Sequence, residues 1–288
     1  MKYEFIRKHK SEHSIRRFCR ILKVSSSGYY AWDKRPESQH KQEDRKLSIV
    51  IKEIFDKSKR RYGSPRIWVS LRQAGYCCSR SRVARLMREK GLSACRPRRK
   101  PASSPVEAEV RPVANLLNQD FSAEAPNQKW VSDITYIPTK EGWLYLAAVL
   151  DLFSRKVIGW SMSGVINSHL VMEALKMAIH QRRSTTTTLY HSDQGIQYCS
   201  RAMVALVESS QLIMSMSRRG NCYDNAVMES FWASLKRETS ARKGYADRLE
   251  AKGDLFRYIE GFYNRVRLHS SLGYLSPDDY ERMYQLIP

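Results

Sequence analysis

Three acidic side chains occupy positions that need a chemical explanation. Asp133 lies inside WVSDITY, a β-branched and aromatic run in which a carboxylate is costly unless something binds it. Asp193 ends the run TLYHSD, and Glu229 lies in the helical pattern NCYDNAVMESFWASLK (221–236). If the three carboxylates converge, their hard oxygen atoms suit Mg²⁺ or Mn²⁺ and not zinc.

A site of this kind is suited to attack at a phosphodiester. Two divalent ions about 3.5–4 Å apart stabilise both the entering and the leaving oxygen of an in-line displacement. The chain then needs no nucleophilic side chain, because the attacking group is a metal-activated water or a DNA 3′-hydroxyl. The predicted chemistry is therefore DNA cleavage or strand joining with two bound ions per site.

The phase of the segment 221–236 separates Glu229 from the apolar side of the predicted helix. Val227, Phe231 and Leu235 recur at i, i+4 and i+8 and form the expected buried stripe. Glu229 lies about 200° around the helix from Val227. The same phase predicts a shared outer face, with an amide and a cation to meet DNA, that holds Asn225, Glu229, Trp232 and Lys236.

The elements around these acids indicate one fold. Three β-rich runs at 129–139, 143–152 and 155–163 predict an antiparallel meander. The remaining expected elements are a helix at 168–183, a strand at 188–193, a helix at 200–210, a strand at 212–217 and the helix that carries Glu229. This order is that of a ribonuclease H-like domain, an α/β (α+β) fold in which the first and fourth strands are neighbours, so the three acids can converge.

The front of the chain is strongly basic. Residues 1–100 hold 29 Lys and Arg against 9 Asp and Glu, and therefore carry +20 of the net charge of +21. A module that binds a polyanion is the natural interpretation, because each cation that neutralises a phosphate releases condensed counterions. The alternative is a positive surface that only confers solubility.

Helical patterns accompany this charge. SIRRFCRILKVSSSGYYAWDKRP (14–36) predicts a helix, a turn and a short helix, and a longer helix is expected at about 42–59. Residues 61–92 predict a helix-turn-helix. The basic side chains expected to face DNA there are Arg66, Arg80, Arg82, Arg85 and Arg88, the last three forming a row every three residues. The alternative is a solvated basic face on a helical bundle.

The expected domain organisation has four parts. Residues 1–45 form an N-terminal helical module and 46–94 a helix-turn-helix-like basic domain. Residues 95–120 are rich in Pro, Ser and charge and form a basic linker in which Arg98, Arg99 and Lys100 are candidates for DNA contact. Residues 121–288 form the ribonuclease H-like catalytic domain with a C-terminal helical extension.

Cysteine spacing and hydropathy exclude several classes of protein. The six cysteines contain no C-x-x-C and no nearby histidine pair, so zinc is not expected and the thiols should act as small buried side chains. The sequence has no apolar run of about eighteen residues and no apolar stretch after MKYEFIRKHK. Neither a membrane span nor export is indicated, and we expect a bacterial cytoplasmic protein.

Several other polar residues have two possible roles. Asp151 is expected to form a turn after its strand, and Asp224 to cap the following helix and not to bind metal. His191, two residues before Asp193, either assists the site or is a packed histidine. Arg267 and His269, in YNRVRLHSSLGY, either touch a DNA backbone or lock the C-terminal segment onto the catalytic domain.

Several motifs in order resemble those of one family. WVSDITYIP, DLFSRKVIGW, HSDQGIQY, DNAVMESFWASLK and YNRVRLHSSLGYLSP are accompanied by SSSGYYAW and RYGSPRIW nearer the N-terminus. Glu229 follows Asp193 by 36 positions, with 35 residues between them, and Lys236 is seven residues further on. With this spacing, the motifs resemble those of the DDE transposase and retroviral integrase superfamily. More narrowly, the chain is similar to the catalytic chain of IS-three family insertion-sequence transposases, the product of the second reading frame.

The resemblance implies an integrase-type catalytic core and a DNA transposase. It implies Asp133, Asp193 and Glu229 as ligands of Mg²⁺ or Mn²⁺ and Lys236 as a DNA contact. It further implies double-stranded element ends and target DNA as partners, a homo-oligomer on that DNA at the nucleoid, and fusion or pairing with the upstream-frame protein. Two alternatives stay open at this point: a ribonuclease H-like nuclease without strand transfer, and a non-catalytic DNA-binding helper chain.

Overall fold

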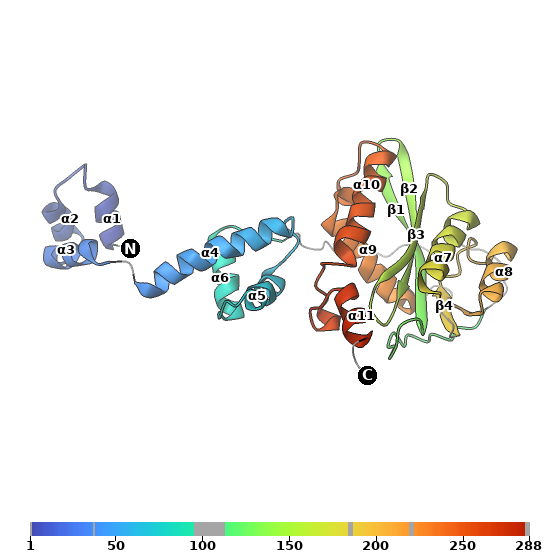
Figure 1. Cartoon of the computed structure of the whole chain (residues 1–288). Helices are drawn as coiled ribbons and strands as arrows, with labels where there is room; N and C mark the ends of the chain where they lie inside the picture. The colour runs from blue at the N-terminus through green and yellow to red at the C-terminus, as the bar shows by residue number, and fades with distance from the viewer. Residues whose placement is uncertain (1, 37, 95–112, 184–186, 219–221, 286–288) are drawn as a thin grey trace.

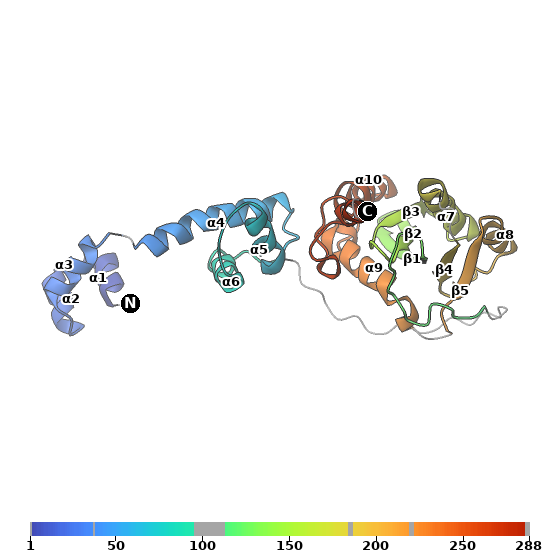
Figure 2. The same cartoon turned by 60° about the horizontal axis from the view of Figure 1, so that its bottom comes forward.

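The computed structural model describes residues 2–36, 38–94, 113–183, 187–218 and 222–285. Within these ranges six helices precede the sheet, and the remaining elements surround it (Figure 1). In both views the first three helices lie at the end of the molecule away from the sheet, and a long helix extends toward the sheet domain (Figure 2). The helices of the basic front thus lie to one side of the sheet domain, which the near-neutral remainder of the sequence forms.

The first body is a three-helix module with its own small core. Its helices are α1 (Lys2–His9), α2 (Ile15–Ile21) and α3 (Ser26–Lys34). Ser25 caps α3, accepting a hydrogen bond from the amide of Gly28. The buried side chains are Ile6, Cys19 and Tyr29. The predicted pair of helices before Pro36 is confirmed, and α1 was not predicted.

The second body contains the predicted helix-turn-helix. It consists of α4 (Gln39–Lys57), α5 (Ser64–Gln73) and α6 (Arg80–Glu89) around Ile51, Phe55, Ile67, Leu71 and Val83. Gly75, in the turn after α5, has a φ of +84°, which glycine adopts without strain. Helix α4 runs without interruption across the expected boundary at 45/46, so that boundary is wrong and the break lies between α3 and α4.

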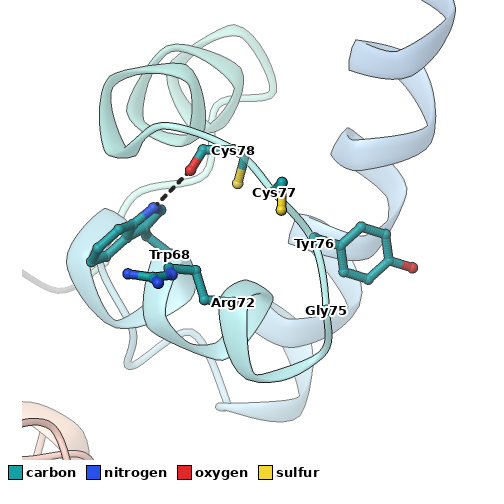
Figure 3. A pocket seen from close by; sticks show the side chains of 6 residues that line it. All are labelled: Trp68, Arg72, Gly75, Tyr76, Cys77 and Cys78. Atoms are coloured by element: carbon teal, nitrogen blue, oxygen red, sulfur yellow. Dashed lines mark hydrogen bonds between the residues drawn. The ribbon is translucent and has the colours of Figure 1, made fainter.

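A hollow marks the turn between α5 and α6 (Figure 3). The indole nitrogen of Trp68 donates to the main-chain oxygen of Cys78 at 2.9 Å, which ties the turn to α5. The Arg72 guanidinium lies over the Trp68 ring, 5.2 Å from its centroid. Cys77, which precedes Cys78 in this turn, is exposed, so the expectation that the cysteines are buried is wrong for this thiol. Cys19 is buried, as expected.

The sheet has five strands in the order β3-β2-β1-β4-β5. Their bounds are β1 (Lys129–Thr139), β2 (Gly142–Asp151), β3 (Val157–Ser163), β4 (Thr188–Ser192) and β5 (Leu212–Met216). The first three form the predicted antiparallel meander, and β4 pairs parallel with β1. This order, with helices on both faces, is the expected ribonuclease H-like fold.

Helices cover both faces of the sheet. On one face lie α7 (Ser168–Arg182) and α8 (Arg201–Ser209), packed over Ala147, Val149 and Tyr190. The approach of α7 to β3 requires a glycine, because a Cβ on Gly159 would lie 2.1 Å from the main-chain oxygen of Ala174.

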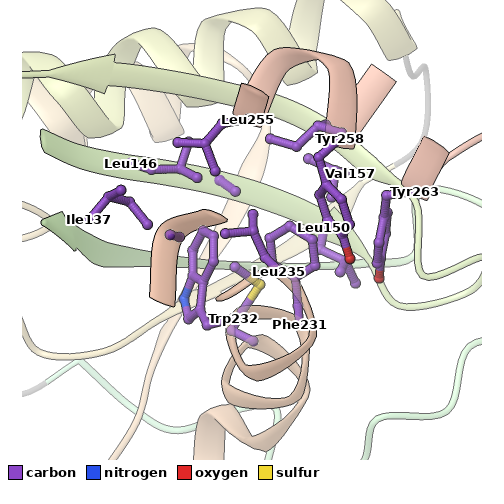
Figure 4. Packing of buried hydrophobic residues seen from close by; sticks show 14 of the residues in the cluster. Ile137, Leu146, Leu150, Val157, Phe231, Trp232, Leu235, Leu255, Tyr258 and Tyr263 are labelled. Carbon is purple, nitrogen blue, oxygen red and sulfur yellow. The ribbon is translucent and has the colours of Figure 1, made fainter. Parts of the chain in front are cut away.

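On the other face lie α9 (Ala226–Glu238) and α10 (Arg248–Tyr258). Figure 4 shows Phe231, Trp232 and Leu235 of α9 beside Leu146 and Leu150 of β2. Packing of this extent fixes the position and rotation of α9 on the sheet.

The segments at both ends of the sheet domain also pack on it. Leu117 is buried in the same cluster as α9, so the part of the expected linker from 113 to 120 belongs to the catalytic domain. After α10 the chain forms a π-helical turn and returns to the sheet, where the side-chain amide of buried Asn264 bonds both main-chain groups of Val157. The remaining elements are η1 (Cys222–Asn225), η2 (Ser240–Arg242), η3 (Ile259–Tyr263), η4 (Ser270–Leu272) and α11 (Pro277–Gln285).

Candidate active site

Asp133 and Asp193 lie at the same level of two neighbouring strands. The last parallel pair of β1 and β4 joins Val131 to His191. Each aspartate follows its member of that pair by two residues, so the register places the two carboxylates side by side at the point where β4 ends. The sequence expectation that the first and fourth strands are neighbours is confirmed.

The Asp133 carboxylate is held in a defined orientation. Its Oδ2 accepts a hydrogen bond from the indole nitrogen of Trp232 at 2.9 Å, and its Oδ1 accepts one from the amide of Ile134 at 2.8 Å. Asp133 is half-buried in the middle of β1. Neither donor carries a charge, so these contacts orient the carboxylate without neutralising it.

The carboxylates repel one another. Burial raises the pKa of Asp133 to about 7, with a second contribution from the charge of Asp193 and a smaller one from that of Glu229. Desolvation also raises the pKa of Asp193, although the Gly195 amide donates to its Oδ1 at 3.0 Å. The charge of Asp193 therefore acts more strongly on Asp133 than the charge of Glu229 does.

Glu229 is exposed in the first turn of α9. Behind it the helix is buried through Met228, Phe231, Trp232 and Leu235. The buried side of α9 is thus rotated from the expected stripe of Val227, Phe231 and Leu235 toward Trp232. Trp232 is 6% exposed, so the expectation that it shares the outer face with Glu229 is wrong. This placement of Trp232 on the core side is what brings its indole nitrogen to Asp133.

Asn225 is the second tie between α9 and β1. It is buried just before the helix, and its Nδ2 donates to the main-chain oxygen of Ser132 at 3.2 Å. The expectation that Asn225 faces DNA is wrong in this structure, since its amide holds the residue next to Asp133. Lys236 lies partly buried in the last turn of α9, about 10 Å along the axis from Glu229.

The donor set suits a hard divalent cation. All three side chains offer carboxylate oxygens, which Mg²⁺ and Mn²⁺ prefer. Within the described ranges, none of the three makes an ion pair with a lysine or arginine, so their negative charge is uncompensated. In those same ranges no three His, Cys, Asp or Glu side chains already stand close enough to hold an ion.

His191 and Asp151 have structural roles. The ring nitrogens of buried His191 are both within hydrogen-bond distance of serine hydroxyls, Ser215 at 2.9 Å and Ser217 at 3.1 Å, and burial lowers its pKa to about 4. His191 is thus the packed histidine of the two alternatives. Asp151 accepts from the amide of Phe153 at 3.0 Å, which confirms its turn-forming role.

Asp224 does not cap α9. It is fully buried, and its carboxylate accepts hydrogen bonds from Arg218, Asn115 and Gln119. Hydrogen bonding from Arg218, first of several causes, holds the pKa of Asp224 well below its usual range. This carboxylate joins the segments before and after the sheet, so the expected cap is corrected to a buried carboxylate paired with the half-exposed Arg218.

The four arginines of α6 that were expected to face DNA divide into two groups. Arg82 Nε donates to Asp44 at 2.7 Å and Arg85 Nη2 to the other oxygen of the same carboxylate at 2.7 Å, so both point to α4. This corrects their expected orientation. Arg80 and Arg88 are exposed and form no ion pair with any described residue. Arg98, Arg99 and Lys100 lie outside the described residues.

Arg66 instead joins the helix-turn-helix to the sheet domain. Its Nε donates to the main-chain oxygen of Leu268 at 2.8 Å, and Tyr62 donates to that of Val266 at 3.0 Å. Arg61 Nε donates to the main-chain oxygen of Glu238, the last residue of α9, at 2.8 Å. No local sequence pattern indicated this contact, because its two sides are about 200 residues apart.

Arg267 and His269 also bind protein. Both are buried, and Arg267 donates to both oxygens of Glu238 at 2.9 Å and to His269 Nε2 at 3.2 Å. Of their two expected roles, these contacts fit the lock on the C-terminal segment and leave no free guanidinium for a phosphate.

Comparison with known proteins extends these observations. Residues 123–222 and 210–277 match families described as Integrase core domain, and residues 41–101 match the HTH-like domain. The chain is 46% identical over 286 residues to Transposase InsF for insertion sequence IS3A of Escherichia coli (strain K12), covering 98% of each protein. The chain belongs to the IS3 family of insertion-sequence transposases.

Other relatives of this IS3-family chain include an Insertion element IS600 uncharacterized 31 kDa protein of Shigella sonnei, 42% identical over 92% of this chain and 98% of that protein. Among solved structures, the HTLV-2 integrase catalytic core domain in complex with magnesium is 16% identical, with a TM-score of 0.44 over 56% of this chain and 99% of that one. A chain of the simian T-cell lymphotropic virus intasome structure is 14% identical, with a TM-score of 0.46. The match covers 82% of this chain and 76% of that one.

The family membership makes this chain a transposase-type enzyme that acts on DNA. The HTH-like match covers residues 41–101 of the basic front and its linker, and the two integrase-core matches together cover the three carboxylates. None of the helices in the described ranges is both long and apolar enough to span a membrane.

Proposed function

We propose that this IS3-family chain is a divalent-metal-dependent polynucleotidyl transferase. It nicks DNA at the ends of its insertion element and joins the freed 3′-hydroxyl to a phosphodiester of target DNA. The observation that carries the proposal is the side-by-side register of Asp133 and Asp193, with Trp232 and Asn225 fixing α9 against the same strand.

The proposed metal ligands are Asp133, Asp193 and Glu229, and two Mg²⁺ or Mn²⁺ ions per site fit their chemistry. When bound, two such ions supply stabilisation of the entering and leaving oxygens and ionisation of the attacking hydroxyl. The pKa values of both aspartates are raised by burial, and that of Asp133 also by the charge of Asp193, which supports this assignment because a bound cation would favour the charged carboxylates.

The protein's own groups have distinct tasks in this reaction. Trp232 orients Asp133 through its indole nitrogen, and Asn225 holds the strand residue before it. Glu229 approaches the pair from an exposed position on a packed helix, so it can adjust when DNA arrives. The positively charged front holds DNA through phosphates, with Arg80 and Arg88 as the exposed cations of α6 and Lys236 as a contact near the site.

The proposed partners follow from the reaction. Joining an element to a target requires that two element ends and a target duplex are held together. This requirement favours a homo-oligomer bound to paired element ends. The DNA substrate places the reaction at the nucleoid. Fusion or pairing with the upstream-frame protein would add recognition of the terminal repeats. Both statements rest on the proposed reaction.

The test is Asp133→Asn with labelled element-end duplex, target plasmid and Mg²⁺. Cleavage and joining should both fall by at least about a hundred-fold, while DNA affinity and thermal stability stay close to those of the wild type. Asp120→Asn, which changes an exposed aspartate outside the site, is the matched control and should keep both activities. Joining by the Asp133→Asn protein would overturn the assignment.

The same assay separates the two alternatives. A nuclease without strand transfer would release cut ends and give no joined product. A non-catalytic helper chain would bind the ends and give neither product, with Mn²⁺ in place of Mg²⁺ as well.

A further inference from the structure

A buried carboxylate lies directly before the helix that carries Glu229. Asp224 is fully buried, and its two oxygens accept five hydrogen bonds from described residues. Three come from Arg218: from its main-chain amide at 2.8 Å, from Nε at 3.1 Å and from Nη2 at 2.9 Å. The other two come from neutral side-chain amides, Asn115 Nδ2 and Gln119 Nε2, each at 2.8 Å. A carboxylate with this many fixed donors is held in one orientation.

These hydrogen bonds join two segments that are far apart in sequence. Asn115 and Gln119 precede β1, whereas Asp224 lies in η1, directly before α9. Asn118 and Gln119 both have a positive φ, +44° and +62°, which is uncommon for residues other than glycine. Such a turn persists only where other contacts hold it, and the bond from Gln119 to Asp224 is one of them.

The residues that follow Asp224 connect it to two of the proposed metal ligands. Asn225 is next in the chain, and its Nδ2 donates to the main-chain oxygen of Ser132, the residue before Asp133. Glu229 follows Asp224 by five residues, in the first turn of α9. The position of the helix start therefore determines how Glu229 lies relative to β1.

The segment before β1 also supports the third ligand. Ser215 Oγ, on β5, accepts hydrogen bonds from the amides of Leu116 and Leu117 at 2.9 and 3.2 Å. The same hydroxyl lies 2.9 Å from Nδ1 of His191, which is on β4 two residues before Asp193. One short segment of the chain thus contacts the supports of all three carboxylates.

We propose that Asp224 is a positioning residue for the carboxylate site. Its donors fix the start of α9 and so set where Glu229 lies relative to the two aspartates. Because Asp224 is fully buried and enclosed by donors, it acts through Glu229 and is not itself a candidate ligand. The inference rests on the proposed function for the task of Glu229, whereas fixing the helix start requires no reaction.

The test removes the two neutral donors and keeps the ion pair with Arg218. In the double variant Asn115→Ala, Gln119→Ala, the amides of Glu229 and Ser230 should exchange hydrogen about ten-fold faster in EDTA, since they are the first to bond within α9. With Mg²⁺ and element-end DNA, the maximal rate of cleavage should fall about ten-fold, while the DNA concentration for half-maximal rate stays unchanged. Contacts that served only stability would lower the urea midpoint and leave the maximal rate of the folded chain unchanged.

Tyr258→Phe is the matched control at the other end of the same helix. The Tyr258 hydroxyl is a neutral donor to Glu238, the buried carboxylate that ends α9, at 3.0 Å. Its loss should leave both the exchange in the first turn of α9 and the maximal rate unchanged. Equal effects of the control and the double variant, or wild-type exchange at Glu229 in the double variant, would overturn the proposal.

The outcome is separable from that of the proposed function. Faster exchange in the double variant, together with joining by the Asp133→Asn protein, would keep the positioning of α9 and reject the metal assignment. Loss of joining in Asp133→Asn, together with wild-type exchange in the double variant, would do the reverse.

Discussion

The indole nitrogen of Trp232 donates a hydrogen bond of 2.9 Å to Oδ2 of Asp133, linking the helix that carries one proposed metal ligand to the strand that carries another. Trp232 is 6% exposed and packs in the core between α9 and the sheet. The orientation of Asp133 is therefore coupled to core packing. A change in the position of α9 on the sheet would displace Glu229 and alter the orientation of Asp133 at the same time.

Trp232→Phe tests this coupling. The ring stays in the core, but Asp133 loses a charge-assisted hydrogen bond that contributes about 1.5–3 kcal/mol. We expect the Mg²⁺ concentration for half-maximal cleavage to rise, and activity to fall, roughly ten-fold or more. Trp160→Phe is the matched control, because it removes an indole hydrogen bond of 2.7 Å to Glu260, away from the carboxylates. Equal effects of the two changes would contradict the role of Trp232.

The contact between the helix-turn-helix and the end of α9 gives a second prediction. Arg61 and Arg66 each donate to a main-chain oxygen at 2.8 Å, and the Arg61 guanidinium lies 4.3 Å from the centroid of the Phe262 ring. The double change Arg61→Ala and Arg66→Ala should separate one calorimetric unfolding transition into two, because the modules lose their shared contacts. Arg72 lies on α5, as Arg66 does, but its guanidinium packs on Trp68. Arg72→Ala should therefore leave a single unfolding transition.

Hydrogen exchange measures the same contact directly. In the double variant the amide of Leu268, which donates to the Tyr62 hydroxyl at 3.3 Å, should exchange faster. Unchanged protection there would mean that Tyr62 and the apolar contacts alone hold the modules together.

His269 gives a pH prediction. Burial, and then the charges of Arg267, Arg66 and Arg155, lower its pKa to about 2. Its ring also packs on Tyr263, at 4.9 Å between centroids. Since the folded state keeps His269 neutral while the unfolded chain takes up a proton below about pH 6.5, its stabilising contribution is present above that pH and is lost as the pH falls toward 2.

At pH 5 this loss amounts to about 2 kcal/mol. His269→Gln keeps an acceptor for Arg267 and cannot be protonated, so urea unfolding of this variant should depend less on pH between 7.5 and 5 than that of the wild type. His180→Gln, at an exposed position of α7, should retain the wild-type slope. An unchanged slope in the His269 variant would contradict a buried neutral imidazole.

The sequence predicted the elements of the sheet domain because each strand and helix there has a clear apolar period. It also predicted the aspartate pair, since the order of elements determines which strands are neighbours. It placed α9 with the wrong rotation, because Val227, Phe231 and Leu235 at i+4 spacing fit a helix about as well as the true stripe at Met228, Phe231, Trp232 and Leu235.

Long-range pairing explains the other errors. Arg82 and Arg85 have the spacing of a DNA-facing row, but Asp44, about 40 residues earlier, binds both. Nothing in the local pattern distinguishes a cation that meets phosphate from one that meets a carboxylate in another helix. Arg66 and Arg267 follow the same rule, because their acceptors lie on distant segments.

The buried pair of Arg267 and Glu238 gives the last prediction. Two hydrogen bonds of 2.9 Å join them, and their side chains are 5% and 3% exposed. Arg267→Met leaves the Glu238 carboxylate buried without its main partner, which should lower the free energy of unfolding by about 3–5 kcal/mol. Glu238→Leu together with Arg267→Met should recover much of this loss, because no unpaired charge is then left. Lys176→Met, in an exposed pair with Glu173, should change the urea midpoint little. A small effect of Arg267→Met would instead mean that Arg237, 3.7 Å from Glu238, or water can replace the lost partner.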